Sequence, residues 1–157
     1  MQLDDAKRRV LAETKGFMPD DEGEALFRAA VDICRSPVEG PIVEIGSYCG
    51  RSTIWLGAAA QGAGRVVVTV DHHRGSEETQ EGWEHHDPEV MDQRINKMDT
   101  LPFLRRALWD AELEDTVIAV VGASPRVATL WDKEIAMLFI DGGHGAEPVS
   151  YTHLRAH

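Results

Sequence analysis

Four short and almost continuous apolar runs constrain the fold of this chain more than any other feature. Strands that are buried on both faces, as inside a parallel sheet, show such runs. Between the runs, helices are predicted over residues 51–61, 100–112 and 124–132, the last with Ser124 as its N-cap. The runs are IVEI at 42–45, RVVVTV at 65–70, TVIAVV at 116–121 and IAMLFI at 135–140. This alternation predicts an α/β fold with a doubly wound, mostly parallel sheet that binds ligands at the carboxyl ends of its strands.

Two more helices are predicted before the first apolar run, over residues 4–14 and 20–35. In the second of these, Asp21 and Glu24 have the spacing of a capping box. We therefore expect an N-terminal helical cap over residues 1–36.

The rest of the chain is expected to form a partial Rossmann-like domain over residues 37–148, with a sheet that is incomplete after its fourth strand. The polar stretch 72–98 shows no clear period and is interpreted as a long loop at the ligand-binding edge. The ending VSYTHLRAH (149–157) does not continue the pattern. It resembles translated sequencing adapter and is interpreted as an artefactual tail.

Charge and composition exclude several classes of partner. The formal net charge is -11, from 27 acidic and 16 basic residues, which disfavours binding to nucleic acid or anionic lipid. No apolar run approaches the roughly 18 residues of a membrane span, and the first residues lack a secretion signal. A cytoplasmic protein with small-molecule partners is expected, with Cys34 and Cys49 as free thiols.

The first apolar run leads into a glycine-containing loop, EIGSYCGRS, at residues 44–52. A dinucleotide-binding turn reads G-x-G-x-x-G, and its middle glycine lets a pyrophosphate approach the backbone. Tyr48 stands where that glycine would be and fills the space that a pyrophosphate needs. An adenosine-containing ligand without phosphate fits better. The positive sulfonium and ammonium groups of S-adenosylmethionine would also suit the carboxylates of Glu44 and Asp71.

Two motifs carry a resemblance to a known family. VEIGSYCGRST resembles the first motif of class I S-adenosylmethionine-dependent methyltransferases, and within them it is similar to small-molecule O-methyltransferases of the catechol type. LFIDGGH (138–144) is similar to the fourth-strand motif of bacterial relatives called methyltransferase family 24. The resemblance covers about residues 17–148 and implies a Rossmann-like methyltransferase that uses S-adenosylmethionine and a small-molecule methyl acceptor.

The resemblance also implies roles for individual residues. Gly46 and Gly50 would let the loop pass under the methionine part of the cofactor, with Glu44 near its amino group. Asp71 would accept hydrogen bonds from both ribose hydroxyls, one on each carboxylate oxygen. The VVGAS segment after the third run would lie beside adenine. The predicted cofactor site consists of Glu44, Gly46, Ser47, Tyr48, Gly50, Ser52, Asp71, His72, Gly122, Ala123 and Ser124.

Asp141 and His144 are the predicted catalytic residues, because they follow the fourth run at the expected acceptor side. Related enzymes place an aspartate here as a metal ligand, and Mg²⁺ on Asp141 would lower the pKa of the acceptor hydroxyl. His144 could instead be the general base. The alternative is a structural turn with an exposed histidine. The pairs His72–His73 and His85–His86 suggest a second metal site, although solvated loop residues are the favoured interpretation.

Two other functions stay open at this point. One is a nicotinamide-dependent oxidoreductase, against which Tyr48 argues. The other is a catalytically inactive cofactor-binding module. A homo-oligomer is also left open, because nothing in the sequence decides the oligomeric state.

Overall fold

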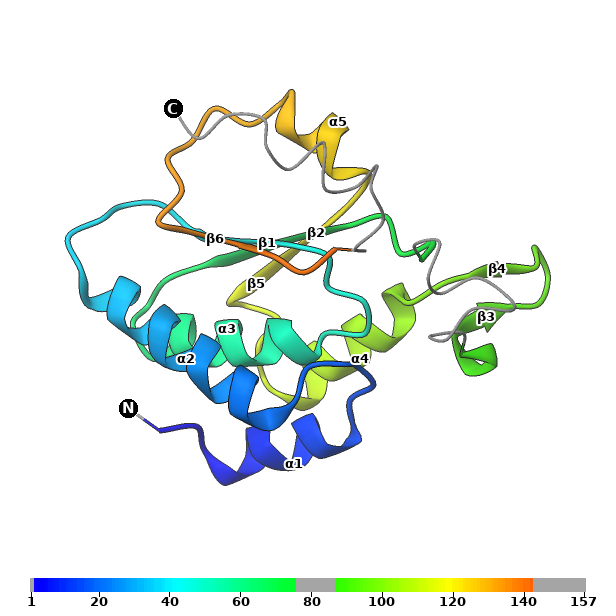
Figure 1. The fold of residues 1–157 in the computed structure, drawn as a ribbon, viewed down its shortest axis with the longest axis horizontal. Helices are drawn as coiled ribbons and strands as arrows, with labels where there is room; N and C mark the ends of the chain where they lie inside the picture. The colour runs from blue at the N-terminus through cyan, green and yellow to red at the C-terminus, as the bar shows by residue number, and fades with distance from the viewer. Residues whose placement is uncertain (1, 76–86, 143–157) are drawn as a thin grey trace.

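The computed structural model describes residues 2–75 and 87–142. Its centre is a four-stranded sheet in the order β5-β2-β1-β6, and every neighbouring pair of strands is parallel (Figure 1). This confirms the predicted α/β class with a parallel sheet. The strands are β1 (Ile42–Ile45), β2 (Val67–Asp71), β5 (Val117–Val121) and β6 (Met137–Ile140).

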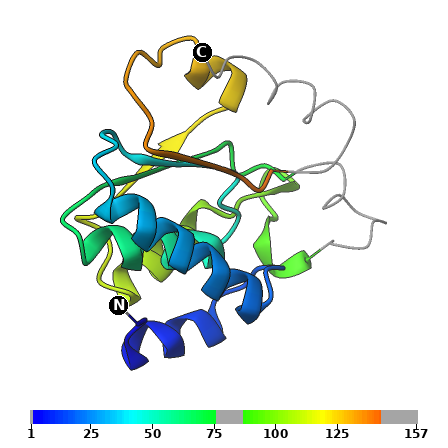
Figure 2. The same ribbon diagram turned by 60° about the vertical axis from the view of Figure 1, so that its left-hand side comes forward.

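Most of the helices lie together on one face of this sheet. Figures 1 and 2 show α1, α2, α3 and α4 in a layer below the strands, whereas the short helix α5 lies on the other face. The helices are α1 (Asp5–Glu13), α2 (Asp20–Arg35), α3 (Arg51–Gln61), α4 (Leu101–Asp110) and α5 (Ser124–Ala128). All five predicted helices are therefore present, and the last one is shorter than expected.

The main hydrophobic core lies between the helix layer and the sheet. Trp55 on α3 is 1% exposed, and the centroid of its indole lies 6.3 Å from that of the Phe27 ring on α2. Gly23 makes this packing possible, because a Cβ at that position would lie 2.1 Å from Nε1 of Trp55. Since α1 and α2 share this core with α3, the helical cap packs directly on the sheet domain, and the boundary proposed at residue 36 stays a prediction.

Two predicted helix starts are wrong in detail. The N-cap of α2 is Pro19, and no side chain forms a capping hydrogen bond there. Asp21 therefore lies inside the helix. Glu24 pairs instead with Arg8 of α1 at 3.3 Å, a tertiary contact that replaces the expected capping box. In α5 the N-cap is Ala123, one residue before the predicted Ser124.

The described part of the predicted loop 72–98 is more ordered than expected. It contains a 3-10 helix, η2 (Pro88–Val90), and a small antiparallel pair of β3 (Met91–Asp92) and β4 (Lys97–Met98). Val90 and Met98 are buried against Cys49 of the glycine loop. This segment therefore packs beside the carboxyl ends of the strands, where the ligand edge is expected.

The face of the sheet that carries α5 is only partly covered in the described structure. Leu138 and Ile140 of β6 are 49% and 42% exposed, and Ile118 of β5 is 55% exposed. Within the described residues β6 pairs with β1 alone. The outer strands β5 and β6 therefore expose apolar side chains, whereas nearly all residues of the inner strands β1 and β2 are buried.

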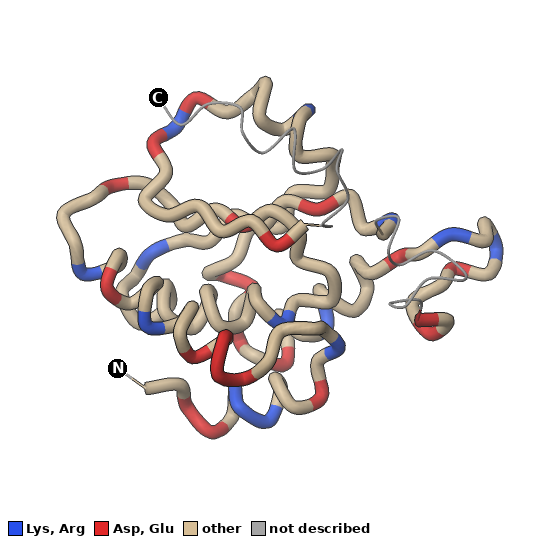
Figure 3. Tube along the Cα trace, in the orientation of Figure 1, with Lys and Arg blue, Asp and Glu red and all other residues tan. Residues whose placement is uncertain are grey.

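The surface of the described chain mixes charges of both signs. Figure 3 shows Lys and Arg interspersed with Asp and Glu along the trace. On α2, for example, the exposed side chains of Arg28 and Glu24 pair at 3.7 Å. Among the described residues, no helix is long and apolar enough to cross a bilayer.

Candidate functional site

The predicted cofactor residues converge at the carboxyl edge of the sheet. The glycine loop follows β1, Asp71 ends β2, Gly122 follows β5 and Asp141 follows β6. Backbone hydrogen bonds tie these strand ends together: the N–H of Gly122 donates to the carbonyl of Asp71 at 3.0 Å, and the N–H of Asp141 donates to that of Ile45 at 2.8 Å. The parallel topology thus brings together segments that lie up to 97 positions apart in the chain, between residues 44 and 141.

The glycine loop has an unusual backbone conformation. Gly46, Tyr48 and Gly50 have positive φ angles of 89°, 49° and 100°. A Cβ on Gly46 would lie 2.7 Å from the backbone of Gly142, so this glycine is also required by close packing. The protein's own fold therefore accounts for Gly46 and Gly50, and their predicted contact with a cofactor stays a prediction.

Asp71 holds the glycine loop in place. Its Oδ2 accepts hydrogen bonds from the backbone N–H groups of Ser47 at 3.0 Å and Tyr48 at 2.9 Å. Its Oδ1 accepts one from the N–H of His73 at 2.8 Å. A carboxylate oxygen accepts about two hydrogen bonds, so Oδ2 is saturated and Oδ1 keeps one free position. In this conformation Asp71 can take one ribose hydroxyl on Oδ1, and the predicted symmetrical contact with both hydroxyls would require the loop to release Oδ2.

Glu44 is a buried carboxyl group with one partnerless oxygen. Its side chain is 0% exposed, and Oε2 accepts hydrogen bonds from the hydroxyls of Thr53 at 2.6 Å and Thr69 at 2.7 Å. Oε1 makes no hydrogen bond of good geometry. Burial raises the pKa of Glu44 to about 7, and the nearby charge of Asp141 adds to this rise, whereas neighbouring hydroxyls, including that of Ser52, oppose it. Glu44 is thus poised to gain a donor or a positive charge.

A second buried polar atom lies in the same loop. The hydroxyl oxygen of Ser47 is buried and has no hydrogen-bond partner. Buried polar groups without a partner are costly and uncommon. Together with Oε1 of Glu44, this atom makes the loop suitable for a ligand that carries hydrogen-bond donors and positive charge, as the methionine part of S-adenosylmethionine does.

The two histidines after β2 have different environments. His72 is exposed, and its Nδ1 accepts a hydrogen bond from the N–H of Arg74 at 3.0 Å. His73 is 3% exposed, and its Nδ1 lies 2.7 Å from the hydroxyl of Thr100. Burial lowers the pKa of His73, which favours the neutral ring. His73 therefore joins β2 to the start of α4, and only His72 is exposed beside the ligand edge.

The turn after β5 contains the predicted adenine contacts. Gly122 and Ser124 are half-buried, and Ala123 is exposed. The hydrogen bond from Gly122 to the Asp71 carbonyl fixes this turn beside the end of β2. The contact of these three residues with adenine stays a prediction.

The thiol and phenol groups of the loop are not activated. Burial raises the pKa of Cys49 to about 12 and that of Tyr48 to about 12, so both groups are neutral near pH 7. Cys34 and Cys49 are free thiols, as expected. These residues pack the loop and offer no nucleophile.

The described residues do not form a metal site. Among them no group of three or more His, Cys, Asp and Glu side chains is placed to hold a metal ion. Asp141 is exposed and follows β6 as predicted, but it lacks further ligands in the described part of the chain. The predicted base His144 and the pair His85–His86 lie outside the described residues. Within residues 2–75 and 87–142, Asp141 thus has too few neighbouring donors to hold Mg²⁺, and the predicted metal role of Asp141 stays a prediction.

Sequence comparison identifies the family. A family model for a methyltransferase domain, family 24, matches residues 43–155, which is most of the chain. The chain therefore belongs to this methyltransferase family, as its two motifs predicted. The match begins in β1 and includes every strand end that meets at the candidate site.

Several solved structures with similar folds are named O-methyltransferases. An O-methyltransferase from Bacillus cereus in complex with SAH has a TM-score of 0.61 and 21% identity, over 97% of this chain and 60% of that one. TomG from Streptomyces achromogenes, an O-methyltransferase of tomaymycin synthesis in complex with SAM, has a TM-score of 0.61 and 19% identity, over 96% and 59%. A putative O-methyltransferase from Klebsiella pneumoniae has a TM-score of 0.61 and 18% identity, over 97% and 60%.

These likenesses establish the Rossmann-like methyltransferase fold. The chain spans about three fifths of the length of these three proteins.

Two features of the site were missed by sequence reasoning. The first is the role of Asp71 as acceptor for the loop N–H groups, and the second is the pair of threonine hydroxyls on Glu44. A usable signal existed for the first, because an acid at a strand end faces a turn with unpaired N–H groups. No signal existed for the second, since Thr53 and Thr69 come from a helix and a strand that meet Glu44 only in the fold.

Proposed function

We propose that this chain forms the cofactor-binding part of an S-adenosylmethionine-dependent methyltransferase that methylates an oxygen atom of a small molecule. Membership of the methyltransferase family supports the class of reaction. The observation that carries the proposal is the glycine loop tied to Asp71, with the partnerless Oε1 of Glu44 and Oγ of Ser47 buried beside it. These groups suit the ammonium-bearing end of the cofactor.

Each residue at the edge has a proposed task. Glu44 would accept a hydrogen bond from the ammonium group, and ionisation of the carboxyl would accompany binding. Asp71 would offer the free position on Oδ1 to a ribose hydroxyl while Oδ2 keeps the loop closed. Gly122, Ala123 and Ser124 would flank the adenine ring.

The chemical step needs little from the protein beyond positioning. Bound S-adenosylmethionine would supply a methyl group on a positively charged sulfur. The glycine loop would hold the reacting carbon in line with the acceptor oxygen, and such alignment is capable of lowering a barrier by about 7–11 kcal/mol. Asp141 and His144 remain the proposed groups on the acceptor side, with His144 as the base that removes the hydroxyl proton.

Titration calorimetry with S-adenosylhomocysteine and with NAD tests the proposal. We expect micromolar binding of S-adenosylhomocysteine, no binding of NAD, and a tenfold or greater loss of affinity in Asp71→Asn, because the amide would turn donors toward the loop N–H groups or lose an acceptor on Oδ1. Asp110→Asn is the matched control, since Asp110 is exposed at the end of α4. A folded protein that binds NAD alone would support the oxidoreductase alternative, and binding of S-adenosylhomocysteine without methyl transfer by the full-length protein would support the inactive module.

A further inference from the structure

The segment between α1 and α2 runs beside the candidate site. Residues 14–19, called the N-terminal strap below, approach the ligand edge at two points. The centroid of the Phe17 ring lies 5.3 Å from that of Tyr48 in the glycine loop, with an interplanar angle of 39°. Nζ of Lys15 forms ion pairs with the carboxylates of Asp87 at 2.7 Å and Glu89 at 2.5 Å, at the start of η2. The strap therefore bridges two segments that flank the site.

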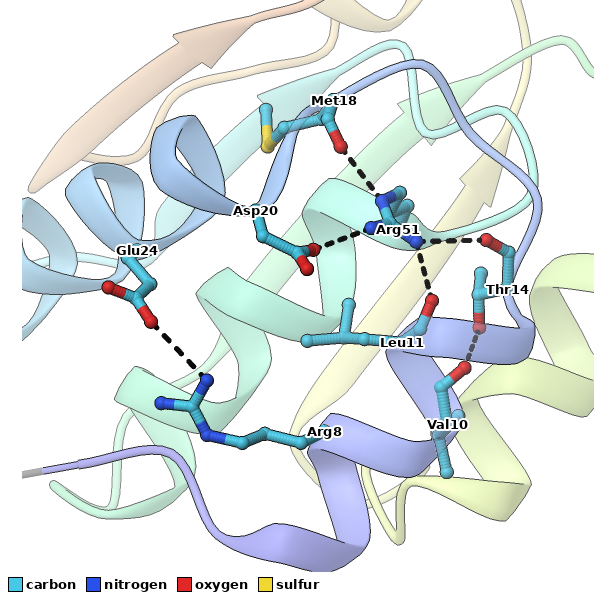
Figure 4. A network of polar contacts seen from close by, with 8 residues as sticks. All are labelled: Arg8, Val10, Leu11, Thr14, Met18, Asp20, Glu24 and Arg51. Atoms are coloured by element: carbon cyan, nitrogen blue, oxygen red, sulfur yellow. Dashed lines mark hydrogen bonds and ion pairs between the residues drawn. The ribbon is translucent and has the colours of Figure 1, made fainter.

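Arg51 forms the third and most extensive attachment of the strap. Its Nε donates to the carbonyl of Met18 at 2.8 Å, and its Nη1 donates to the carbonyls of Leu11 and Thr14 (Figure 4). Its Nη2 pairs with the carboxylate of Asp20 at 2.6 Å. One guanidinium group thus binds the end of α1, the strap and the first residue of α2.

This position is an unfavourable one for a cation unless it has such partners. Arg51 is the first residue of α3, where the partial positive charge of the helix terminus disfavours a positive side chain. The carbonyls of Leu11 and Thr14 lie at the negative end of α1 and offset that cost. The planar fork of arginine serves four acceptors at once, whereas a lysine ammonium offers a single point of attachment.

The strap is also shaped to receive this side chain. A Cβ on Gly16 would lie 2.6 Å from Cβ of Arg51, so any larger residue would push the two apart. The arginine is mostly shielded from solvent, since its side chain is 17% exposed. Gly16 and Arg51 therefore form one close contact between the strap and the start of α3.

We propose that Arg51 is a positioning residue that couples the N-terminal strap to the glycine loop, so that ligand binding at the loop and ordering of the strap favour each other. Arg51 directly follows Gly50 in the glycine loop, and the same loop is held three to four residues earlier, at Ser47 and Tyr48, by Asp71. A shift of the loop therefore moves the anchor of the strap. This inference rests on the proposed function, because the ligand is the proposed cofactor.

Coupling of this kind is reciprocal. If ligand binding stabilises the ordered strap, then loosening the strap lowers the affinity for the ligand by the same factor. About tenfold is a typical size for such a factor. A purely structural arginine would lower the stability of the protein and leave the affinity of the folded state unchanged. Affinity and stability measured on the same variants thus separate the two roles.

Arg65 provides a matched control. It also binds two backbone carbonyls, those of Val38 at 2.8 Å and Ser36 at 3.1 Å. It lies at the amino end of β2, on the edge of the sheet opposite to the candidate site. Arg65→Met therefore removes an arginine clamp of the same type without touching the strap.

The experiment combines calorimetry with amide hydrogen exchange on the whole chain, using S-adenosylhomocysteine as the probe. We expect the ligand to slow exchange of strap amides in the wild type. We expect Arg51→Met to weaken binding about tenfold and to abolish that protection, and Arg65→Met to keep the affinity within about twofold. Arg51→Lys and Gly16→Ala are milder variants that serve if Arg51→Met does not fold, and both should weaken binding in the same direction.

The outcomes are distinguishable. If S-adenosylhomocysteine does not bind to the wild-type protein, the proposed function is overturned. A wild type that binds, together with folded Arg51→Lys and Gly16→Ala variants of unchanged affinity, would overturn the coupling alone. Equal losses of affinity in Arg51→Met and Arg65→Met would also refute it, because the effect would then follow from general destabilisation.

Discussion

Glu44→Gln should remove a large part of the dependence of stability on pH. Glu44 is fully buried, and burial raises the pKa of its carboxyl from 4.5 to about 7. The native state therefore holds a proton on Glu44 at pH values where the unfolded chain has released it. Glutamine keeps a carbonyl acceptor for the hydroxyls of Thr53 and Thr69 and cannot ionise.

The size and direction of the effect follow from this change in pKa. Because the folded pKa lies above the unfolded one, the native state loses stability as the pH rises from about 4.5 to about 7. Each tenfold change in proton affinity corresponds to about 1.4 kcal/mol, so ionisation of Glu44 lowers the free energy of unfolding by at most about 3–4 kcal/mol. Below pH 4.5 the carboxyl is protonated in both states, and the loss is absent.

Urea unfolding at pH 5 and pH 8 measures the effect. The other carboxylates of the protein contribute equally in both proteins, so the difference between wild type and Glu44→Gln isolates Glu44. We expect the variant to gain about 2–3 kcal/mol relative to wild type on going from pH 5 to pH 8. Glu13→Gln, an exposed change at the end of α1, is the control and should show no such gain. A pH dependence of Glu44→Gln that matches wild type within about 0.5 kcal/mol would refute the reasoning.

Three further substitutions test the packing around the core and the site. Gly23→Ala places a Cβ 2.1 Å from the indole nitrogen of Trp55, and we expect a loss of about 1–3 kcal/mol in thermal or urea unfolding; an unchanged midpoint would contradict the tight contact. Gly46→Ala adds a Cβ at φ 89° and 2.7 Å from the backbone of residues 141–142, so we expect a loss of at least about 1 kcal/mol and weaker binding of S-adenosylhomocysteine. Lys15→Met removes two partly exposed ion pairs with η2, and we expect less than about 1 kcal/mol, a difference that shrinks in 1 M salt; a larger, salt-independent loss would show that Lys15 packs and does not merely pair.

The sheet was predictable because burial on both faces leaves a strong signal. The runs at 42–45 and 135–140 became strands whose ends differ from the prediction by at most two residues. The chain alternates between such runs and helices, and right-handed parallel connections then leave few possible topologies. The same logic predicted that acids at strand ends would meet at one edge.

The errors arose where a tertiary contact decides local structure. Glu24 has the spacing of a capping residue, but Arg8 from α1 binds its carboxylate. The predicted helix at 124–132 ends at Ala128, and α5 buries none of its residues in the described structure. A helix without a buried face gains little from packing, so its pattern alone overestimates its length.

In the candidate site, too, some features could be predicted from the sequence and others depend on tertiary contacts. The types and strand-end positions of Glu44, Asp71 and Asp141 could be read from the chain, because topology alone brings them together. The contacts of Arg51 could not, since they join residues that are 31 to 40 positions apart. Spacing carries no information on contacts at that distance, and only the packed fold reveals them.

The described residues divide the proposed reaction into two separable parts. All the predicted cofactor-binding residues lie within the described structure, near the carboxyl ends of β1, β2 and β5 or in the turns and helix starts that follow them. Of the two predicted catalytic residues, only Asp141 is described, and it follows the outer strand β6. The proposed cofactor site can therefore be tested on described residues alone, whereas the proposed acceptor side also includes His144, which lies outside them. For this chain a binding measurement is the stronger test of the cofactor site, because a lack of methyl transfer would leave the assignments of Glu44 and Asp71 unaffected.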